Sequence, residues 1–149
     1  VKNKMTVGAS NKWSDVLSSI FANEWSLTCV SRIRKEKNTG DTNISRLRAI
    51  AQRASDAGCG NCGEQAAIAF IWLLDNKVKP IDYMSRNNAD HAFVVVGRDL
   101  SAPLDDPSKW GEDCFVCDPW DGKSYSVNDI SKKIYGGGVI APASIARVD

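Results

Sequence analysis

The segment GCGNCGEQAAIAFIWLL constrains the fold most, because nearly every residue in the range 66–74 is apolar. A helix that is apolar on every side has to be covered on every side by the rest of the chain. We therefore expect a central buried helix over residues 62–75. Asn61 and Glu64 have the spacing of a capping pair at its first turn, in which Asn accepts from free backbone amides and Glu reaches back.

The chain before this helix is also expected to be helical. In NKWSDVLSSIFANEW the apolar side chains recur at helical spacing, which predicts an amphipathic helix over residues 13–21. A second helix is expected over residues 26–37, and a third from residue 41 or 42 to Gly58.

After Pro80 the pattern changes to short runs of β-branched and aromatic residues, which are typical of strands. The expected strands are HAFVVVG (91–97), CFVC (114–117), KSYSV (123–127) and a last edge strand within GGGVIAPASIARV. Ser126 and Asp129 have the spacing to cap a short helix through Ile134. Helices followed by a small antiparallel sheet make an α+β fold.

Length and charge limit the classes of function. We expect the 149 residues, 1–149, to form a single domain with one core. The formal net charge of +1 gives no bulk attraction to nucleic acid or to an anionic membrane, so neither is an expected partner. No apolar run reaches the ~18 residues of a membrane span, and the start VKNKMTVGAS has no stretch of the signal-peptide type.

The five cysteines are an odd number, which does not indicate a fold stapled by disulfides and favours a reducing place of action. One interpretation is structural zinc, because CGNC and CFVC are both C-x2-C pairs that together supply Cys59, Cys62, Cys114 and Cys117. The interval between the pairs is, however, far longer than the usual ~15–20 residues. CFVC is also expected to be a strand with both thiols on one side, rather than a tight turn.

A second interpretation is a redox-active pair formed by Cys59 and Cys62 at the helix start. A thioredoxin-like motif follows a strand in a βαβ unit, whereas a helix is expected before this one.

The third interpretation uses Cys62 as a nucleophile. A thiol attacks a carbonyl carbon as the thiolate, which the free amides and the dipole of a helix N-terminus favour. Gly58, Gly60 and Gly63 are expected to leave room for a substrate backbone. The buried helix behind the thiol would hold the sulfur in place.

The thiolate needs a base, and His91 is the one histidine in the sequence. It opens an expected strand, and strand ends commonly display catalytic side chains. Asp118 ends the following strand and can accept from the imidazole, which fixes the tautomer and stabilises the imidazolium. Asp90 and Asp121 suit this role less, because Asp90 adjoins His91 on the opposite side of its strand and Asp121 belongs to a D-G turn.

With these residues, the sequence resembles papain-like cysteine hydrolases, and more closely the compact papain-fold domains of bacterial toxins and secreted effectors. CGNCG before a buried helix is similar to the papain-type Cys-Gly-x-Cys element, DHAFVVVG to the histidine strand, and VCDPWDG to the strand that ends in the third triad residue. The resemblance covers about residues 55–127 and implies a catalytic triad of Cys62, His91 and Asp118. It also implies a papain-like fold, with the central helix packed on the sheet.

The sequence departs from the papain pattern near the oxyanion site. Papain has a glutamine six residues before the nucleophile, and Asp56 stands at that position here. Because a carboxylate would repel the oxyanion, we expect the Cys62 amide with Asn61 or Gln65 to supply that site. Gly63 is expected to lie beside the substrate. Secreted papain relatives also tie the first Cys of this element into a disulfide, a pairing that the odd cysteine count leaves open here.

The resemblance implies attack by a thiolate on an amide carbon, a thioester intermediate and hydrolysis by water, without a metal or cofactor. Members of this type cleave a target-cell protein or deamidate one of its Gln or Asn side chains. The small catalytic region favours a deamidase here, with a cysteine protease as the alternative.

The implied place of action is the cytoplasm of a target cell, after secretion or injection. The implied partners are a protein substrate and a cognate inhibitor or chaperone. The alternative from another class is an interaction module without catalysis, stabilised by zinc on the four cysteines of the two C-x2-C pairs.

Overall fold

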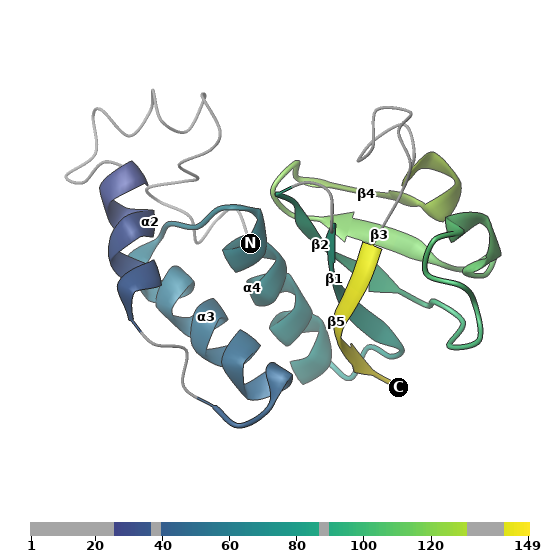
Figure 1. Ribbon diagram of the computed structural model, residues 1–149, viewed down its shortest axis with the longest axis horizontal. Helices are drawn as coiled ribbons and strands as arrows, with labels where there is room; N and C mark the ends of the chain where they lie inside the picture. The colour runs from purple at the N-terminus through teal and green to yellow at the C-terminus, as the bar shows by residue number, and fades with distance from the viewer. Residues whose placement is uncertain (1–25, 37–39, 87–89, 131–141) are drawn as a thin grey trace.

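The computed structural model describes residues 26–36, 40–86, 90–130 and 142–149. Within these ranges a layer of helices packs against one face of an antiparallel sheet (Figure 1), so the predicted α+β class is confirmed. The predicted helix over residues 13–21 lies outside the described residues. Among the described helices, none has the length and apolar character needed to cross a membrane.

The helical layer contains α2 (Ser26–Lys35), α3 (Asn43–Ala57) and α4 (Cys62–Asp75). All three lie close to their predicted bounds. The hydroxyl of Thr42 caps α3 by accepting from the Ser45 amide at 3.1 Å, and α3 ends where Gly58 adopts a left-handed φ of 69°.

The sheet is antiparallel, with the strand order β4-β3-β2-β1-β5. Its strands are β1 (Ile81–Arg86), β2 (Ala92–Val96), β3 (Phe115–Asp118), β4 (Lys123–Ser126) and β5 (Pro142–Val148). β2, β3 and β4 match predicted strands, and β5 is an edge strand as predicted. β1 is not predicted from the sequence, because the charged Asp82 stands among its apolar residues.

The predicted helix after β4 is present in part. The Ser126 hydroxyl accepts from the Asn128 amide and begins a 3-10 helix over Val127–Asp129. The continuation of this predicted helix through Ile134 lies outside the described residues.

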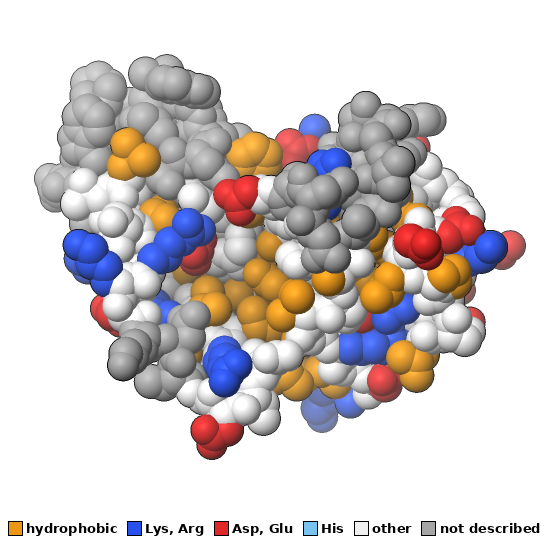
Figure 2. All heavy atoms as spheres, in the orientation of Figure 1, with side chains coloured by type: hydrophobic (Ala, Val, Ile, Leu, Met, Phe, Trp, Pro, Cys, Tyr) orange, Lys and Arg blue, Asp and Glu red, His pale blue; other side chains and the backbone are white. Residues whose placement is uncertain are grey.

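α4 lies at the centre of the fold, between α3 and the strands β1, β2 and β3. Ala66, Ala67 and Phe70 are fully buried, as the apolar run predicts. In its last turn, however, Trp72 is 62% exposed, so the prediction of cover on every side is wrong there. Figure 2 shows hydrophobic side chains gathered in a hollow between the helical layer and the sheet on the face turned to the viewer.

A second apolar cluster covers the opposite face of the sheet. Phe93 and Val95 of β2 and Val116 of β3 pack there with Trp110, which is fully buried. The indole Nε1 of Trp110 donates to the Pro103 carbonyl at 2.9 Å. The connection between β2 and β3 is therefore fastened over this face and holds both strands in place.

A buried ion cluster ties β5 to β1. The fully buried carboxylate of Asp82 accepts hydrogen bonds from Arg98 (3.0 and 3.1 Å), Arg147 (2.6 Å) and Ser144 (2.8 Å). A buried charge is tolerated only where it is paired and hydrogen-bonded. These partners explain why an aspartate can stand at a fully buried position of β1.

Asp82→Asn is expected to lower the free energy of unfolding by about 3–5 kcal/mol, because it leaves the buried Arg98 guanidinium without its counter-charge and Arg147 with Asp149 alone. Asp75→Asn is the matched control. Asp75 forms a bidentate pair with Arg48 between half-exposed side chains, and its loss should change the stability far less because solvent screens the pair. Urea unfolding measures both losses, and equal values would contradict this account of β1.

Candidate active site

Cys62 is the first residue of α4, and the turn between α3 and α4 holds it in place. The Glu64 carboxylate reaches back and accepts from the Asn61 amide at 2.9 Å, as the predicted capping pair requires. A side chain at position 60 would collide with Glu64, since a Cβ on Gly60 would lie 2.5 Å from the Glu64 Cβ. Gly60 is thus explained by packing within the turn, whereas we expected it to make room for substrate.

His91 and Asp118 come together because they stand at the ends of neighbouring antiparallel strands. His91 precedes β2, Asp118 ends β3, and the two strands pair directly. His91 Nε2 lies 2.8 Å from Asp118 Oδ2, and these side chains are 16% and 4% exposed. The Asp118 side chain is held in turn by the Asp121 amide, which donates to Oδ1 at 3.2 Å.

The thiol of Cys62 lies against the residues that open β2. Cys62 is 3% exposed, and its Sγ is 3.8 Å from the Asp90 carbonyl oxygen. The thiol and the imidazole of His91 also interact electrostatically. Because Nε2 of His91 is occupied by Asp118, the ring nitrogen left for the thiol is Nδ1. The structure therefore brings together Cys62, His91 and Asp118, the three residues predicted from the sequence.

The environment of His91 favours the imidazolium. Burial by itself lowers the pKa of His91, but the hydrogen bond with Asp118 and the interaction with the Cys62 thiol, together with their negative charges, raise it from 6.5 to about 9. At neutral pH the ring is accordingly charged, and an imidazolium beside a thiol stabilises the thiolate.

Two aromatic rings enclose the imidazole and are not predicted from the sequence. Phe93 stacks on His91 with ring centroids 6.0 Å apart, and Trp120 contacts it edge-on at 5.9 Å. They limit the access of water to the His91–Asp118 hydrogen bond. The position of Trp120 in CDPW, close behind the candidate carboxylate, is the signal that could have indicated it.

The predicted oxyanion donors differ in how they are held. The Gln65 side chain uses one N–H to donate to the Gly60 carbonyl at 2.8 Å, which stabilises the turn, and its role at the oxyanion stays a prediction. The Gly63 carbonyl accepts from the Tyr83 hydroxyl at 3.2 Å, and Asn61 is buried. The Cys62 amide, at the first position of α4, has no partner within the helix by geometry and remains the candidate donor.

Tyr83 is a further residue at the site that sequence reasoning missed. Burial, followed by the negative charges of Cys62 and Glu64, raises the pKa of Tyr83 well above its usual range. Its phenol therefore stays neutral and keeps its hydrogen bond to Gly63. Asp56, which stands where papain has a glutamine, is exposed on α3 and accepts from Gln52 at 2.8 Å.

The cysteines are distributed differently from two of the predictions. Cys29 and Cys59 form a disulfide between α2 and the turn before α4, so the expectation of a chain without disulfide staples is wrong. An odd count excludes pairing of every cysteine but allows one pair. The same disulfide removes Cys59 as a redox partner for Cys62.

The four cysteines of the zinc alternative are not brought together. Cys59 is bonded to Cys29, Cys114 packs in the cluster around Trp110, and Cys117 packs against the core on the helical side. The expectation that both thiols of CFVC lie on one side is wrong, because residues three apart in an extended segment face opposite sides. Among the described residues, no group of three or more His, Cys, Asp or Glu side chains could hold a metal ion.

Comparisons with protein-family models, with curated proteins and with solved structures found no significant match to this chain.

Among the free thiols, we expect iodoacetamide to alkylate Cys62 fastest at neutral pH, because only Cys62 has the imidazolium of His91 as its partner. Burial, followed by the charge of Asp82, raises the pKa of Cys114 to about 11, and burial also raises the pKa of Cys117. Peptide mapping by mass spectrometry measures the rate of alkylation at each of these thiols. His91→Ala should slow the labelling of Cys62 alone, and a faster reaction at Cys117 would refute the assignment.

The raised pKa of His91 also predicts how stability depends on pH. The folded protein keeps a proton on His91 up to about pH 9, whereas the unfolded chain loses it near pH 6.5. The stabilisation of the fold by protonated His91 is therefore fully present below pH 6.5 and is lost as the pH rises through about 9. Asp118→Asn removes a negative charge that raises the pKa of His91. The free energy of unfolding of this variant should therefore fall less steeply as the pH rises. Urea unfolding at several pH values tests this, and an unchanged slope would contradict it.

Proposed function

We propose that this chain is a papain-like cysteine hydrolase in which Cys62 is the nucleophile, His91 the base, and Asp118 the carboxylate that orients the imidazole. One observation carries the proposal. A single imidazole is hydrogen-bonded through Nε2 to a buried carboxylate and interacts electrostatically with a thiol at the N-terminus of a buried helix. This is the arrangement by which a protein generates a thiolate nucleophile.

In the first half of the reaction, the Cys62 thiolate attacks an amide carbon. A C–S bond forms, and the carbonyl π electrons move to the oxygen, to which the Cys62 amide donates a hydrogen bond. His91 then gives its Nδ1 proton to the amide nitrogen. The C–N bond breaks, the amine or ammonia leaves, and a thioester remains on Cys62.

In the second half, neutral His91 takes a proton from water, and the resulting hydroxide attacks the thioester carbon. The C–S bond breaks, the carboxylic acid leaves, and the thiolate and imidazolium are restored. Asp118 stays ionised throughout and keeps the ring oriented, which is the role a triad carboxylate performs.

We propose a target-cell protein as the substrate, with deamidation of a Gln or Asn side chain preferred over cleavage of the main chain. The deep position of the thiol supports this preference, since Cys62 is only 3% exposed. A terminal carboxamide on a flexible side chain reaches such a thiol more easily than a main chain does. Proteolysis by the same triad is the alternative outcome.

We also propose that the protein is delivered to its target cell by secretion or injection, where a cognate inhibitor or chaperone is a further partner. The Cys29–Cys59 disulfide supports a stage in an oxidising environment, since such bonds form and persist there. The earlier expectation of a reducing place of action then applies to the target-cell cytoplasm.

The proposal predicts distinct losses along the triad. Cys62→Ala should abolish turnover, and His91→Ala should lower it by about 10²–10⁴-fold or more, because His91 performs both proton transfers. The two losses should not add, since the residues act as one unit. Asp118→Ala should leave residual activity, and Asp118→Asn should retain more, because an amide oxygen still accepts from the ring.

Asp121→Asn is the control for Asp118→Asn. The Asp121 carboxylate pairs with Lys123 at the surface, and its backbone amide, which the substitution keeps, supports Asp118, so this variant should be close to neutral. The assay is mass spectrometry of target-cell proteins treated with each variant, with circular dichroism to verify folding. Gln or Asn converted to Glu or Asp indicates deamidation, and fragments indicate proteolysis. If Cys62→Ala produced the same products as wild type, the proposed function would be wrong.

A further inference from the structure

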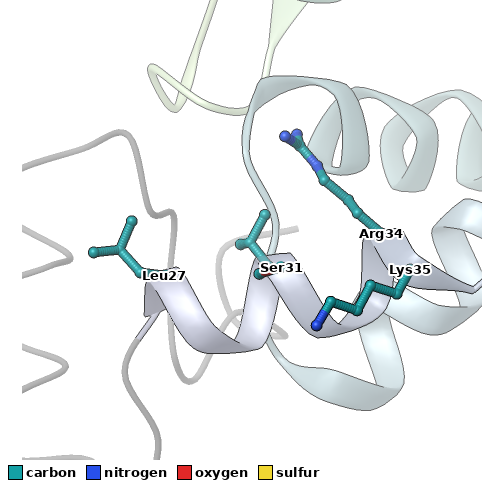
Figure 3. A pocket seen from close by; sticks show the side chains of 5 residues that line it. Leu27, Ser31, Arg34 and Lys35 are labelled. Atoms are coloured by element: carbon teal, nitrogen blue, oxygen red, sulfur yellow. The ribbon is translucent and has the colours of Figure 1, made fainter.

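Arg34 of α2 reaches across to the first turn of α4. Its guanidinium binds the Glu64 carboxylate through two hydrogen bonds, from Nε to Oε1 at 2.7 Å and from Nη2 to Oε2 at 2.9 Å. The Glu64 side chain is 10% exposed, whereas that of Arg34 is 51% exposed. In Figure 3 the Arg34 side chain extends away from α2 in a different direction from Lys35, with which it lines a surface hollow of about 420 Å³.

Glu64 connects this guanidinium to the turn that carries the thiol. The same oxygen that accepts from Arg34, Oε2, also accepts from the Asn61 amide at 2.9 Å. Asn61 directly precedes Cys62, so one carboxylate joins the cation of α2 to the backbone at the nucleophile. A bidentate guanidinium restricts that carboxylate in both position and plane.

The helix that carries Arg34 is itself fastened to this turn. Cys29 of α2 is bonded to Cys59, three residues before Cys62. α2 therefore holds the turn on both sides of the nucleophile, through a covalent bond before it and an ion pair after it. This double attachment gives Arg34 a defined place in spite of its exposure.

The charges around the thiol make the ion pair relevant to its reactivity. Arg34 of α2, Tyr83 of β1 and His91 interact electrostatically with Cys62, whose Sγ lies 3.8 Å from the Asp90 carbonyl oxygen. Glu64 of α4 lies two residues after Cys62 and binds the Asn61 amide before it. The hydrogen bond to Glu64 raises the pKa of Arg34 most, burial opposes it, and the charges of Glu64, Asp90 and Cys62 raise it further. Electrostatic interaction is reciprocal, so the guanidinium also stabilises a negative charge on Cys62.

We propose that Arg34 is a positioning residue for the nucleophile: it holds Glu64 so that the turn presents Cys62 to His91, and it cancels the carboxylate charge beside the thiol. Without Arg34, a largely buried carboxylate in the first turn of α4 would oppose formation of the thiolate. The inference rests on the proposed function, because it assigns Arg34 a part in activating that nucleophile.

The test is the pH–rate profile of iodoacetamide alkylation at Cys62 in the intact, oxidised chain, measured by peptide mapping. Arg34→Gln is expected to move the midpoint of this profile upward by about one pH unit, because a cation beside the thiol is lost. Arg34→Lys, which keeps the charge but has no bidentate geometry, should move it less. Arg34→Gln combined with Glu64→Gln removes both charges and should return the midpoint towards the wild-type value.

Arg48→Gln is the matched control. Arg48 forms an equally bidentate pair with Asp75 at the other end of α4, and its side chain is 50% exposed, against 51% for Arg34. Its removal should leave the profile unchanged. Thermal unfolding monitors the fold of every variant, and Arg34→Lys provides the comparison if Arg34→Gln does not fold.

The outcomes separate this inference from the proposed function. A Cys62 that reacts quickly in wild type but has the same midpoint in Arg34→Gln, Arg34→Lys and Arg48→Gln overturns the role of Arg34 alone. A wild-type Cys62 no more reactive than Cys117 overturns the proposed function, and this inference with it. An upward shift specific to the Arg34 variants supports the role of Arg34.

Discussion

The burial of α4 between α3 and the sheet is the constraint on which the rest of the structure depends. Because its middle part, residues 66–71, is apolar on all sides and buried, the helical layer and the sheet have to form around it. Its N-terminus then lies where β2 begins and β3 ends. In antiparallel neighbours the start of one strand lies beside the end of the other, so packing of α4 brings Cys62 to His91 and Asp118.

Much of this arrangement could be predicted from the sequence, because it follows from local patterns. The apolar run of α4, the β-branched run of β2 and the capping residues Asn61 and Glu64 each specify an element without reference to the rest of the chain. The candidate triad could be predicted for a related reason. Each member stands at the end of an element, and the order of the elements determines which ends meet.

The parts that could not be predicted depend on partners far apart in the chain. β1 contains Asp82, whose charge is compatible with a strand only because Arg98 and Arg147 come to it from other segments. The number of cysteines does not show that Cys29 and Cys59 pair, since their pairing depends on how α2 packs. Gln65 was assigned to the oxyanion from its place beside the nucleophile, yet its direction is determined by the Gly60 carbonyl.

The distribution of charge explains how the candidate site can hold a thiolate in a largely buried place. Asp118 is balanced by the imidazolium of His91, and Glu64 is balanced by Arg34. With both carboxylates neutralised, the remaining negative charge of the thiolate lies at the N-terminus of α4, where free amides and the helix dipole stabilise it. Under the proposed mechanism, attack moves this charge from sulfur to the substrate oxygen without changing the total. The same helix terminus can therefore stabilise both states, because the sulfur and the oxyanion are bonded to the same carbon.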